Sequence, residues 1–451
     1  MILVTRTERP SLAWTPGPLT VLLLILIVAE SAFASAPETK TLTRFHDPVI
    51  IQTSLLNILA DHRTDHYRLY SAQSGVLAPI PFQFDARDDD GDLVFPDTEA
   101  EQVFIFDMND ELVFMAKDTG DRITSAALPA TSDAALEIEV RDPATGQQGW
   151  TYLLHFQDNP PPPSPVKYAT FDAQTNQART LFYTMEYLPQ RNFFTGMRIA
   201  PAAGGTGVNI LDRMKVRVNP TFSLVLTTWS PLFTEEDFTV RIDGIKNGAV
   251  RAIRRVRQSL DLGKFFPEMP GGTTYTYYYF SSFTTPSKFS APWLVLKALQ
   301  SFRFTGVSDF RKSAVGMTYW DGANPQGLRF TGHNRQVLNT TQDHDWWVAG
   351  GQGGTCLHMF IIPDQWQEWG IVRGTVFVDD DAALDTEGRE AEPGVHAAGY
   401  SLLNMTNLRE PGVYDLSMAT VILPHPYQPG DETQPLAMLK QPLVAEVHKV
   451  K

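Results

Sequence analysis

Short runs in which apolar and polar residues alternate dominate the first third of the chain, and they predict β-strands. Residues 66–71 and 76–84 alternate, and residues 48–55 form a β-branched apolar run. Successive strand side chains point to opposite faces, so this spacing predicts strands that cover a core with one face. The run 76–84 contains two prolines, which cannot donate to a neighbouring strand, and it is therefore expected at a sheet edge. Residues 142–146, Asp-Pro-Ala-Thr-Gly, favour a hairpin turn between two further runs.

The second half of the chain carries longer runs of the same kind. Residues 273–280, Thr-Thr-Tyr-Thr-Tyr-Tyr-Tyr-Phe, consist of the β-branched and aromatic residues that favour strands. Comparable runs occupy residues 223–228, 238–242, 370–378 and 414–423. The best helical spacing covers only residues 291–302. We therefore predict a mainly β protein with few short helices.

Four consecutive prolines at residues 160–163 interrupt this pattern. Proline has no amide hydrogen and favours an extended backbone, so residues 160–165 predict a semi-rigid linker. Several short strands at regular spacing are typical of sandwich folds. We expect an N-terminal β-sandwich over residues 37–159 and a larger sandwich-type β domain over residues 166–451.

The start of the chain has the order of a secretory signal. Arg6 and Arg9 precede an apolar core of 11 residues, 19–29, and small residues around Ala34 offer a cleavage site. Spanning a bilayer as a helix takes roughly 20 residues, so a retained membrane anchor is the less favoured alternative. Residues 1–36 are therefore predicted to be a signal peptide that directs the chain to the periplasm or the cell exterior, with no membrane span after cleavage.

Composition narrows the expected partners. The 451 residues carry a formal net charge of -14, which repels phosphate backbones, so nucleic acid is not an expected partner. Cys356 is the single cysteine, so an internal disulfide is impossible, and we expect this residue to be a small buried apolar group. The motifs for haem attachment and for nucleotide binding do not occur in the sequence.

An acidic stretch around Gly91 is the candidate metal site. Residues 88–92 read Asp-Asp-Asp-Gly-Asp, and alternate carboxylates near a glycine can surround calcium, which takes about six to eight oxygen ligands. In the register of a calcium loop centred on that glycine, the ligands would be Asp88, Asp90, Asp92 and Asp97. The first ligand position is Ala86, which cannot coordinate, and flanking helices are not predicted. The stretch is therefore no EF-hand, and a solvated turn is the alternative to a calcium site.

Two short segments carry a resemblance to known families. Residues 80–85, Ile-Pro-Phe-Gln-Phe-Asp, together with the acidic loop and residues 109–115, Asn-Asp-Glu-Leu-Val-Phe-Met, resemble a pattern of the DUF4861 family of secreted bacterial proteins, which is associated with polysaccharide degradation. Residues 247–252, Asn-Gly-Ala-Val-Arg-Ala, are similar to a strand of carbohydrate-active supersandwich proteins, with Ala249 where proline is usual. The resemblance implies a β-sandwich that leads into a larger sandwich, and it transfers no catalytic residue.

Histidines and arginines form the first group of residues that could carry chemistry. His344 lies between two carboxylates, and with His333 it is a candidate general base. Arg251 is the candidate cation for the same site, as a lyase acting on an acidic polysaccharide would require. On a strand, Arg251 and Arg255 share one face, where they could bind the carboxylates of an acidic sugar or pair with an internal acidic strand. Both alternatives are open at this point.

Trp366 and Trp369 form the second group. Flat aromatic faces beside amides and carboxylates bind sugars, and the segment Trp-Gln-Glu-Trp has that composition, although core packing is the alternative. We therefore expect a secreted envelope protein that binds carbohydrate or another cell-surface ligand, with calcium at the acidic loop. A lyase or hydrolase for acidic polysaccharide is one alternative. An accessory subunit of an envelope protein assembly is the other.

Overall fold

The computed structural model describes residues 37–59, 62–96, 98, 100–189, 191–223, 226–260, 269–332, 335–380 and 395–451. The predicted signal peptide lies outside these residues, as do His333 and Asp97. Antiparallel sheets dominate the described chain, and its three α-helices are short: α1 (Trp293–Ala298), α2 (Asp364–Glu368) and α3 (Thr433–Lys440). The prediction of a mainly β protein is confirmed. None of the helices in the described residues has the length and apolarity needed to cross a membrane.

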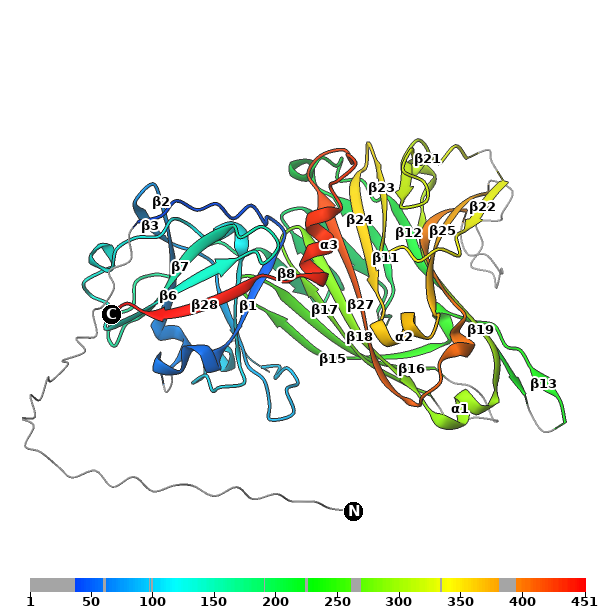
Figure 1. Cartoon of the computed structure of the whole chain (residues 1–451), viewed down its shortest axis with the longest axis horizontal. Coiled ribbons are helices and arrows are strands. Elements are labelled where there is room, and N and C mark those ends of the chain that lie inside the picture. The colour runs from blue at the N-terminus through cyan, green and yellow to red at the C-terminus, as the bar shows by residue number, and fades with distance from the viewer. Residues whose placement is uncertain are drawn as a thin grey trace, which may run out of the picture. The chain divides into compact units, whose positions relative to one another are not determined.

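Two sheets form the first β-sandwich (Figure 1). The larger has the strand order β28-β6-β7-β2-β3 and the smaller has the order β1-β5-β4. The strands are β1 (Pro48–Gln52), β2 (Tyr67–Gln73), β3 (Val76–Pro79), β4 (Gln83–Asp85), β5 (Glu111–Met115), β6 (Ala134–Arg141), β7 (Gln148–His155) and β28 (Val444–Lys449). Leu69 and Leu153 of the larger sheet share a buried cluster with Ile51 and Leu112 of the smaller one. β3 and β4, on either side of Pro81, both lie at sheet edges, as the prolines predict.

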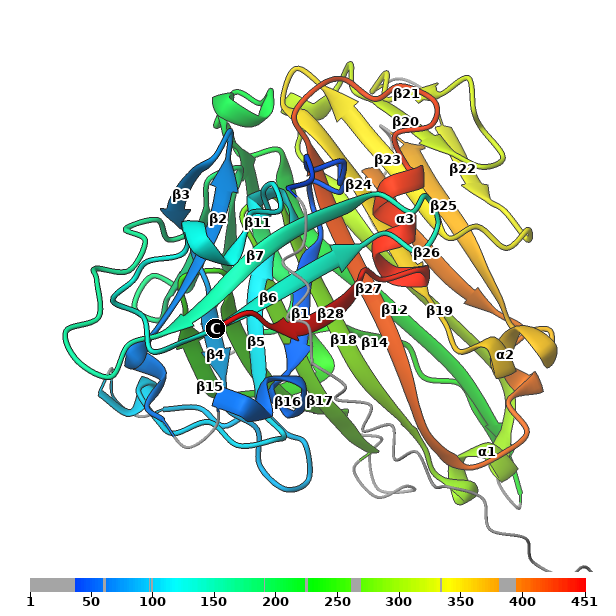
Figure 2. The ribbon, with the colours of Figure 1, turned by 60° about the vertical axis from the view of Figure 1, so that its left-hand side comes forward.

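The last strand of the chain belongs to this first sandwich. β28 pairs antiparallel with β6, so that Val447 lies opposite Ile138 (Figure 2). The predicted second domain, 166–451, therefore contains a C-terminal strand that returns to the sheet of residues 37–159. The residues of β28, Val-Ala-Glu-Val-His-Lys, indicate a strand, but they carry no signal for the sheet that it joins.

Two larger sheets form the second sandwich. The seven-stranded sheet has the order β13-β12-β19-β26-β25-β22, with β14 paired to β12, and the nine-stranded sheet has the order β15-β16-β17-β18-β27-β24-β23-β20-β21. The seven-stranded sheet consists of β12 (Leu211–Ser223), β13 (Thr228–Trp229), β14 (Phe233–Thr234), β19 (Leu299–Phe310), β22 (Arg335–Asn339), β25 (Val372–Asp380) and β26 (His396–Leu403). The nine-stranded sheet consists of β15 (Phe238–Asn247), β16 (Ala252–Leu260), β17 (Met269–Tyr278), β18 (Ser282–Ala291), β20 (Thr318–Asp321), β21 (Leu328–Arg329), β23 (Trp346–Gly351), β24 (Gly354–Ile361) and β27 (Gly412–Leu423). Buried residues of both sheets, among them Tyr400 and Phe360, belong to one apolar cluster.

A separate four-stranded sheet precedes these two, in the order β11-β10-β9-β8. Its strands are β8 (Ala169–Asp172), β9 (Gln177–Thr180), β10 (Tyr183–Tyr187) and β11 (Phe194–Ile199). Met185 and Ile199 of this sheet are buried in the same apolar cluster as the second sandwich.

Strand alternation decides which residues enter the space between the two larger sheets. In β17, Thr274, Thr276 and Tyr278 are buried. Tyr275 and Tyr277 point to the other face, where their rings stack at 6.1 Å between centroids. The sequence Thr-Tyr-Thr-Tyr thus sends hydroxyl groups inward and aromatic rings outward.

Candidate functional site

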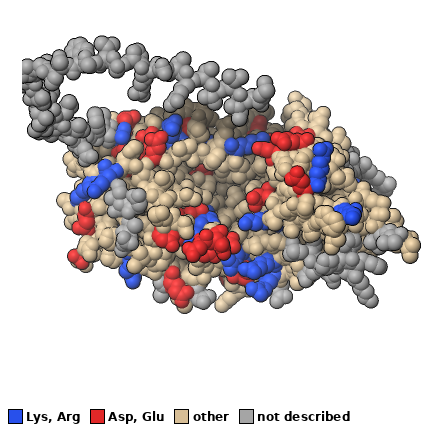
Figure 3. All heavy atoms as spheres, turned by 60° about the horizontal axis from the view of Figure 1, so that its bottom comes forward, with Lys and Arg blue, Asp and Glu red and all other residues tan. Residues whose placement is uncertain are grey.

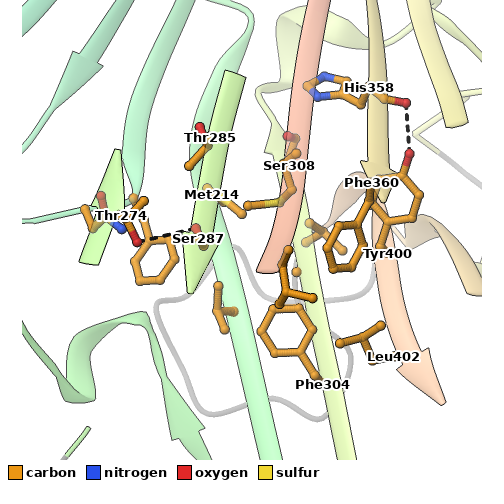
Figure 4. Close-up of a pocket in the computed structure, with 18 of the residues that line it drawn as sticks. Met214, Thr274, Thr285, Ser287, Phe304, Ser308, His358, Phe360, Tyr400 and Leu402 are labelled. Carbon is orange, nitrogen blue, oxygen red and sulfur yellow. Dashed lines mark hydrogen bonds between the residues drawn. The ribbon is translucent and has the colours of Figure 1, made fainter. Parts of the chain in front are cut away.

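A cavity of about 240 Å³ lies between the two sheets of the second sandwich (Figure 4). One wall comes from β12, β19 and β26, and the other from β16, β17, β18, β24 and β27. Protein interiors seldom contain voids larger than a water molecule, so an internal space of this size is a candidate ligand site. A smaller space of about 30 Å³ shares Val218, Leu260, Phe302 and Met405 with the cavity and extends it to Val295 of α1.

The wall from the seven-stranded sheet is mainly apolar. Met214 and Val216 of β12 line it beside Phe302 and Phe304 of β19 and Leu402 of β26. Alternate residues of a strand face the same way, so the patterns Met-x-Val and Phe-x-Phe direct these side chains into the cavity. This wall favours an apolar ligand surface. Removing such surface from water stabilises the bound state by about 25 cal/mol per Å².

The opposite wall carries a row of amide and hydroxyl groups. Gln258 of β16 donates to the Thr274 hydroxyl of β17 at 3.5 Å, and Thr274 and Ser287 of β18 are 3.4 Å apart (Figure 4). Thr276 and Thr285 extend the row along the same two strands. The Thr276 hydroxyl has no hydrogen-bond partner among the described residues, so it can bond to a ligand.

His358 on β24 places a neutral imidazole at the cavity wall. Its Nδ1 shares a hydrogen bond of 2.8 Å with the Thr420 hydroxyl, and its ring stacks on Trp347 at 3.9 Å between centroids. Burial lowers the pKa of His358 to about 3, because the charged form would lose its solvation. Its Nε2 has no hydrogen-bond partner within the described part of the chain, so His358 can bond to a ligand without carrying a charge. The sequence signal for this role was weak, because His358 has no charged neighbour in the chain.

Trp366 and Trp369, the predicted aromatic platform, lie against the core instead of standing in solvent. Trp366 is fully buried and lines the cavity, with its ring 5.3 Å from that of Tyr414. Trp369 is half-buried and meets the same tyrosine edge-on. Trp366 therefore presents no face to solvent, because α2 places its ring in the apolar core, and it can touch a ligand only from inside the cavity.

Arg251 lies at the junction of the two sandwiches. Its guanidinium pairs with Asp85 at 2.7 Å and with Glu111 at 2.8 Å, and it donates to the Tyr279 hydroxyl. Lys246 binds the other oxygen of Asp85 at 2.7 Å. Burial alone would raise the pKa of Asp85, but the two cations lower it to about 2. Arg251 is therefore fully engaged within the fold and is not available to an external ligand or to catalysis.

The two segments of the family resemblance meet at this junction. Gln83 Oε1 accepts hydrogen bonds from the main-chain amides of Val250 and Arg251, both at 2.9 Å. A Cβ at Gly248 would lie 2.0 Å from the same oxygen, so any larger residue there would displace the Gln83 amide from these hydrogen bonds. The residues that carry the resemblance therefore join two sandwiches.

Arg255 also has an internal partner. It pairs with Asp243 at 2.9 Å and lies over the ring of Phe95, and Arg257 reaches the same carboxylate at 2.6 Å. Figure 3 shows basic and acidic side chains in mixed groups over the face that it draws, as such pairing produces. Internal pairing, one of the two alternatives that the sequence left open, accounts for Arg255.

The carboxylates beside His344 form ion pairs with an arginine that the sequence analysis did not identify as a candidate. Asp343 and Asp345 both pair with Arg373 of β25, the first at 2.7 Å. The His344 ring lies beside Gly322. Since His333 lies outside the described residues and Arg251 is held at the junction, the described part of the chain does not assemble the predicted base and cation.

The acidic loop forms a tight turn that is held by one of its own carboxylates. Asp88 Oδ1 accepts hydrogen bonds from the amides of Asp90 at 3.1 Å and Asp92 at 2.8 Å. Within the described residues, no three His, Cys, Asp or Glu side chains converge as a metal site would require, and Asp97 lies outside those residues. Calcium binding by this loop stays a prediction.

At the level of sequence, no protein-family model and no curated protein matches this chain. Among solved structures, it is similar to an α-mannosidase from Enterococcus faecalis, with a TM-score of 0.48 and 8% identity over 92% of this chain and 46% of the mannosidase. A glycosyl hydrolase family 38 protein from the same organism gives a TM-score of 0.45 and 8% identity over 92% of this chain and 47% of its own. The Slr1438 protein from Synechocystis gives a TM-score of 0.34 and 12% identity over 58% of this chain and 98% of its own.

This chain spans less than half the length of the two enterococcal proteins. Likeness at this level of identity concerns the fold alone. We therefore base the function on the cavity and transfer no activity from these proteins.

Proposed function

We propose that this protein binds a small amphipathic molecule between the two sheets of its second sandwich, after export to the periplasm or the cell exterior. The observation that carries the proposal is the cavity of about 240 Å³, in which an apolar wall faces a row of hydroxyl groups. In another protein, an apolar cavity of about 150 Å³ is already sufficient to hold benzene. The space is therefore large enough for the body of a small ligand.

The two walls together define the ligand chemistry. A purely apolar ligand would leave polar groups such as the Thr276 hydroxyl and His358 Nε2 without partners. A free sugar would lose hydrogen bonds against the Met214 wall, and each unsatisfied buried polar group costs about 1–3 kcal/mol. A molecule with an apolar body and polar groups along one edge satisfies both walls. A carbohydrate ligand, which the sequence led us to expect, fits this cavity if it carries such an apolar part.

The proposal is tested with N-phenyl-1-naphthylamine, an uncharged apolar dye that fluoresces when it leaves water. The wild-type protein should give a saturable rise in fluorescence, and 1-decanol should displace the dye. Ser308 lines the cavity opposite Met214 in the strand register, so Ser308→Phe should fill part of the space and weaken dye binding at least about tenfold.

Val208→Phe is the matched control, because it adds the same side chain at an exposed position outside the cavity. It should leave dye binding unchanged. Circular dichroism and thermal unfolding establish that both variants fold. Absence of saturable binding by the wild type, or unchanged binding by a folded Ser308→Phe variant, would contradict the proposal.

A further inference from the structure

Arg254 is a buried cation beside the cavity, and no carboxylate pairs with it among the described residues. It is fully buried on β16, and its guanidinium donates to Asn192 Oδ1 at 3.2 Å and to the main-chain oxygen of Arg191. It lies over the ring of Tyr187 at 4.5 Å. Its Nε is buried and has no hydrogen-bond partner within that same part of the chain.

Several other buried cations meet carboxylates directly, whereas Arg68 is bonded by main-chain oxygens. Arg251 pairs with Asp85, and Lys215 pairs with Asp309 at 2.8 Å. Burying a charge without an opposite charge is costly, because neutral dipoles and an aromatic face replace only part of the lost hydration. The surroundings of Arg254 therefore favour the arrival of an anion.

Asn192 connects this charge to the cavity. Its side chain lines the cavity, accepts from Arg254, and donates to Gln258 Oε1 at 2.9 Å. Gln258 is the first member of the row that continues through Thr274 to Ser287. A polar edge therefore runs from the guanidinium across three strands of the nine-stranded sheet.

The buried charge beside the cavity is positive, although the whole chain has a net charge of -14. Lys288, the residue after Ser287, contributes to the rim of the cavity, but strand alternation points its side chain to the outer face, where Asp415 is its partner in the strand register. Neither an Asp nor a Glu lies among the described residues that line it. The polar edge thus has a buried guanidinium near one end and no carboxylate along it within the described lining.

We infer that the bound molecule is an anionic amphiphile, whose carboxylate or phosphate lies along the edge from Asn192 to Ser287 and whose apolar body lies against the Met214 wall. The inference rests on the proposed function and adds the sign of the ligand charge. A buried cation attracts an anion more strongly in this low-dielectric interior than in water. Neutral amphiphiles of the same length lack this attraction and bind more weakly.

The experiment compares ligands that share a ten-carbon chain and differ in the head group. Decanoate, decyl phosphate and 1-decanol each displace N-phenyl-1-naphthylamine from the wild-type protein at neutral pH. The anions should bind at least about tenfold more tightly than 1-decanol, and the stronger of the two identifies the head group. Equal affinity for all three would overturn the inference and leave the proposed function intact. Absence of displacement by any of them would overturn both.

Arg254→Met removes the buried charge and keeps a long side chain. It should bring decanoate down to the affinity of 1-decanol while 1-decanol binding is unchanged. The control is Arg257→Met on the same strand, because Arg257 is exposed and pairs with Asp243 away from the cavity. Retention of the anion preference in a folded Arg254→Met variant would overturn the role of Arg254.

A second measurement decides the matter if Arg254→Met does not fold. In the wild-type protein, decanoate affinity should fall toward that of 1-decanol as the pH drops through about 4 to 5, where a carboxylate takes up a proton. The 1-decanol titration at each pH corrects for changes in the protein itself. A decanoate-to-decanol ratio that does not change over this range would overturn the inference.

Discussion

Replacing Asp85 with asparagine tests whether the buried ion network holds the two sandwiches together. The Asp85 carboxylate is fully buried, and it binds Arg251 Nε at 2.8 Å and Lys246 Nζ at 2.7 Å. In Asp85→Asn, both cations lose their shared negative partner. Glu111 cannot replace it, because its carboxylate already pairs with Arg251 and, at 2.7 Å, with Arg87.

Two arguments give the size of the effect. Removing one partner from a buried ion pair costs about 3–5 kcal/mol, because the remaining charge stays buried without compensation. Independently, the pKa of Asp85 is lowered from 3.8 to about 2, and one pKa unit corresponds to about 1.4 kcal/mol, so ionisation of this group contributes about 2 kcal/mol to stability. The second value is a lower bound for the substitution, since the asparagine amide also turns N–H donors toward the cations. We expect a loss of about 3–5 kcal/mol at neutral pH.

The pH dependence has a definite sign. The pKa of Asp85 in the folded state lies below its unfolded value, so this contribution is present above about pH 4 and is lost as the pH falls toward 2. Urea unfolding of both proteins, followed by tryptophan fluorescence, gives the free energy of unfolding at each pH. The difference between wild type and Asp85→Asn should shrink by about 2 kcal/mol between pH 5 and pH 2, because other acidic groups titrate in both proteins and cancel.

Glu446→Gln provides the control for a surface ion pair. Glu446 meets Arg141 at 3.4 Å, and both side chains are largely exposed, so its loss should cost less than about 1 kcal/mol. If Asp85→Asn costs no more than this control, the junction network does not stabilise the fold. A difference from wild type that is the same at pH 5 and pH 2 would refute the reasoning about the Asp85 pKa.

Three further outcomes test other parts of the structure. Burial lowers the pKa of His358 to about 3, below its unfolded value of 6.5. This residue should therefore reduce the free energy of unfolding by about 3 kcal/mol as the pH falls from 6.5 to 4. His358→Leu should remove that pH dependence in paired urea titrations. Burial raises the pKa of the Cys356 thiol to about 12, so iodoacetamide at pH 8 should label it only in urea, and equally fast labelling of the native protein by mass spectrometry would contradict this. Deleting residues 444–451 removes β28 and opens the edge of β6, which should lower Tm and increase light scattering, whereas a truncated protein as stable and monomeric as wild type would count against that role.

Local pattern was sufficient for most of the strands and turns, but the strand expected over 223–228 is wrong, because β12 ends at Ser223 and β13 begins only at Thr228. The run 414–423 lies within β27, and the turn at 142–146 joins β6 to β7, because alternation and turn chemistry depend on residues that are adjacent in the chain. The helix expected over 291–302 is limited to Trp293–Ala298. From Leu299 onward the backbone pairs with β12, and these long-range hydrogen bonds override the local helical spacing.

Partners that are far apart in the chain could not be predicted in this way. The sequence left open whether Arg251 binds a ligand or pairs internally, and the structure gives it Asp85, which is 166 residues away. Neither segment specifies the other, because the pairing depends on how two sandwiches dock. The cavity depends on the distance between two sheets whose strands are spread over the second half of the chain. The sequence could therefore mark Trp366 as a candidate ligand-binding aromatic residue, but it could not show that its side chain faces inward.

The threonines of β17 show how a ligand site can be hidden within ordinary strand propensity. Threonine favours strands as valine does, so propensity alone accounts for Thr276 in the sequence. Thr276 is a buried residue whose hydroxyl lies at the cavity wall without a partner among the described residues, and there a valine of similar shape would serve the fold at least as well. Thr276→Val should therefore raise the free energy of unfolding by up to about 1 kcal/mol and weaken 1-decanol binding relative to N-phenyl-1-naphthylamine. Lower stability with unchanged ligand selectivity would show that the hydroxyl serves the fold, whereas higher stability with lost selectivity would show that the protein retains it for the ligand.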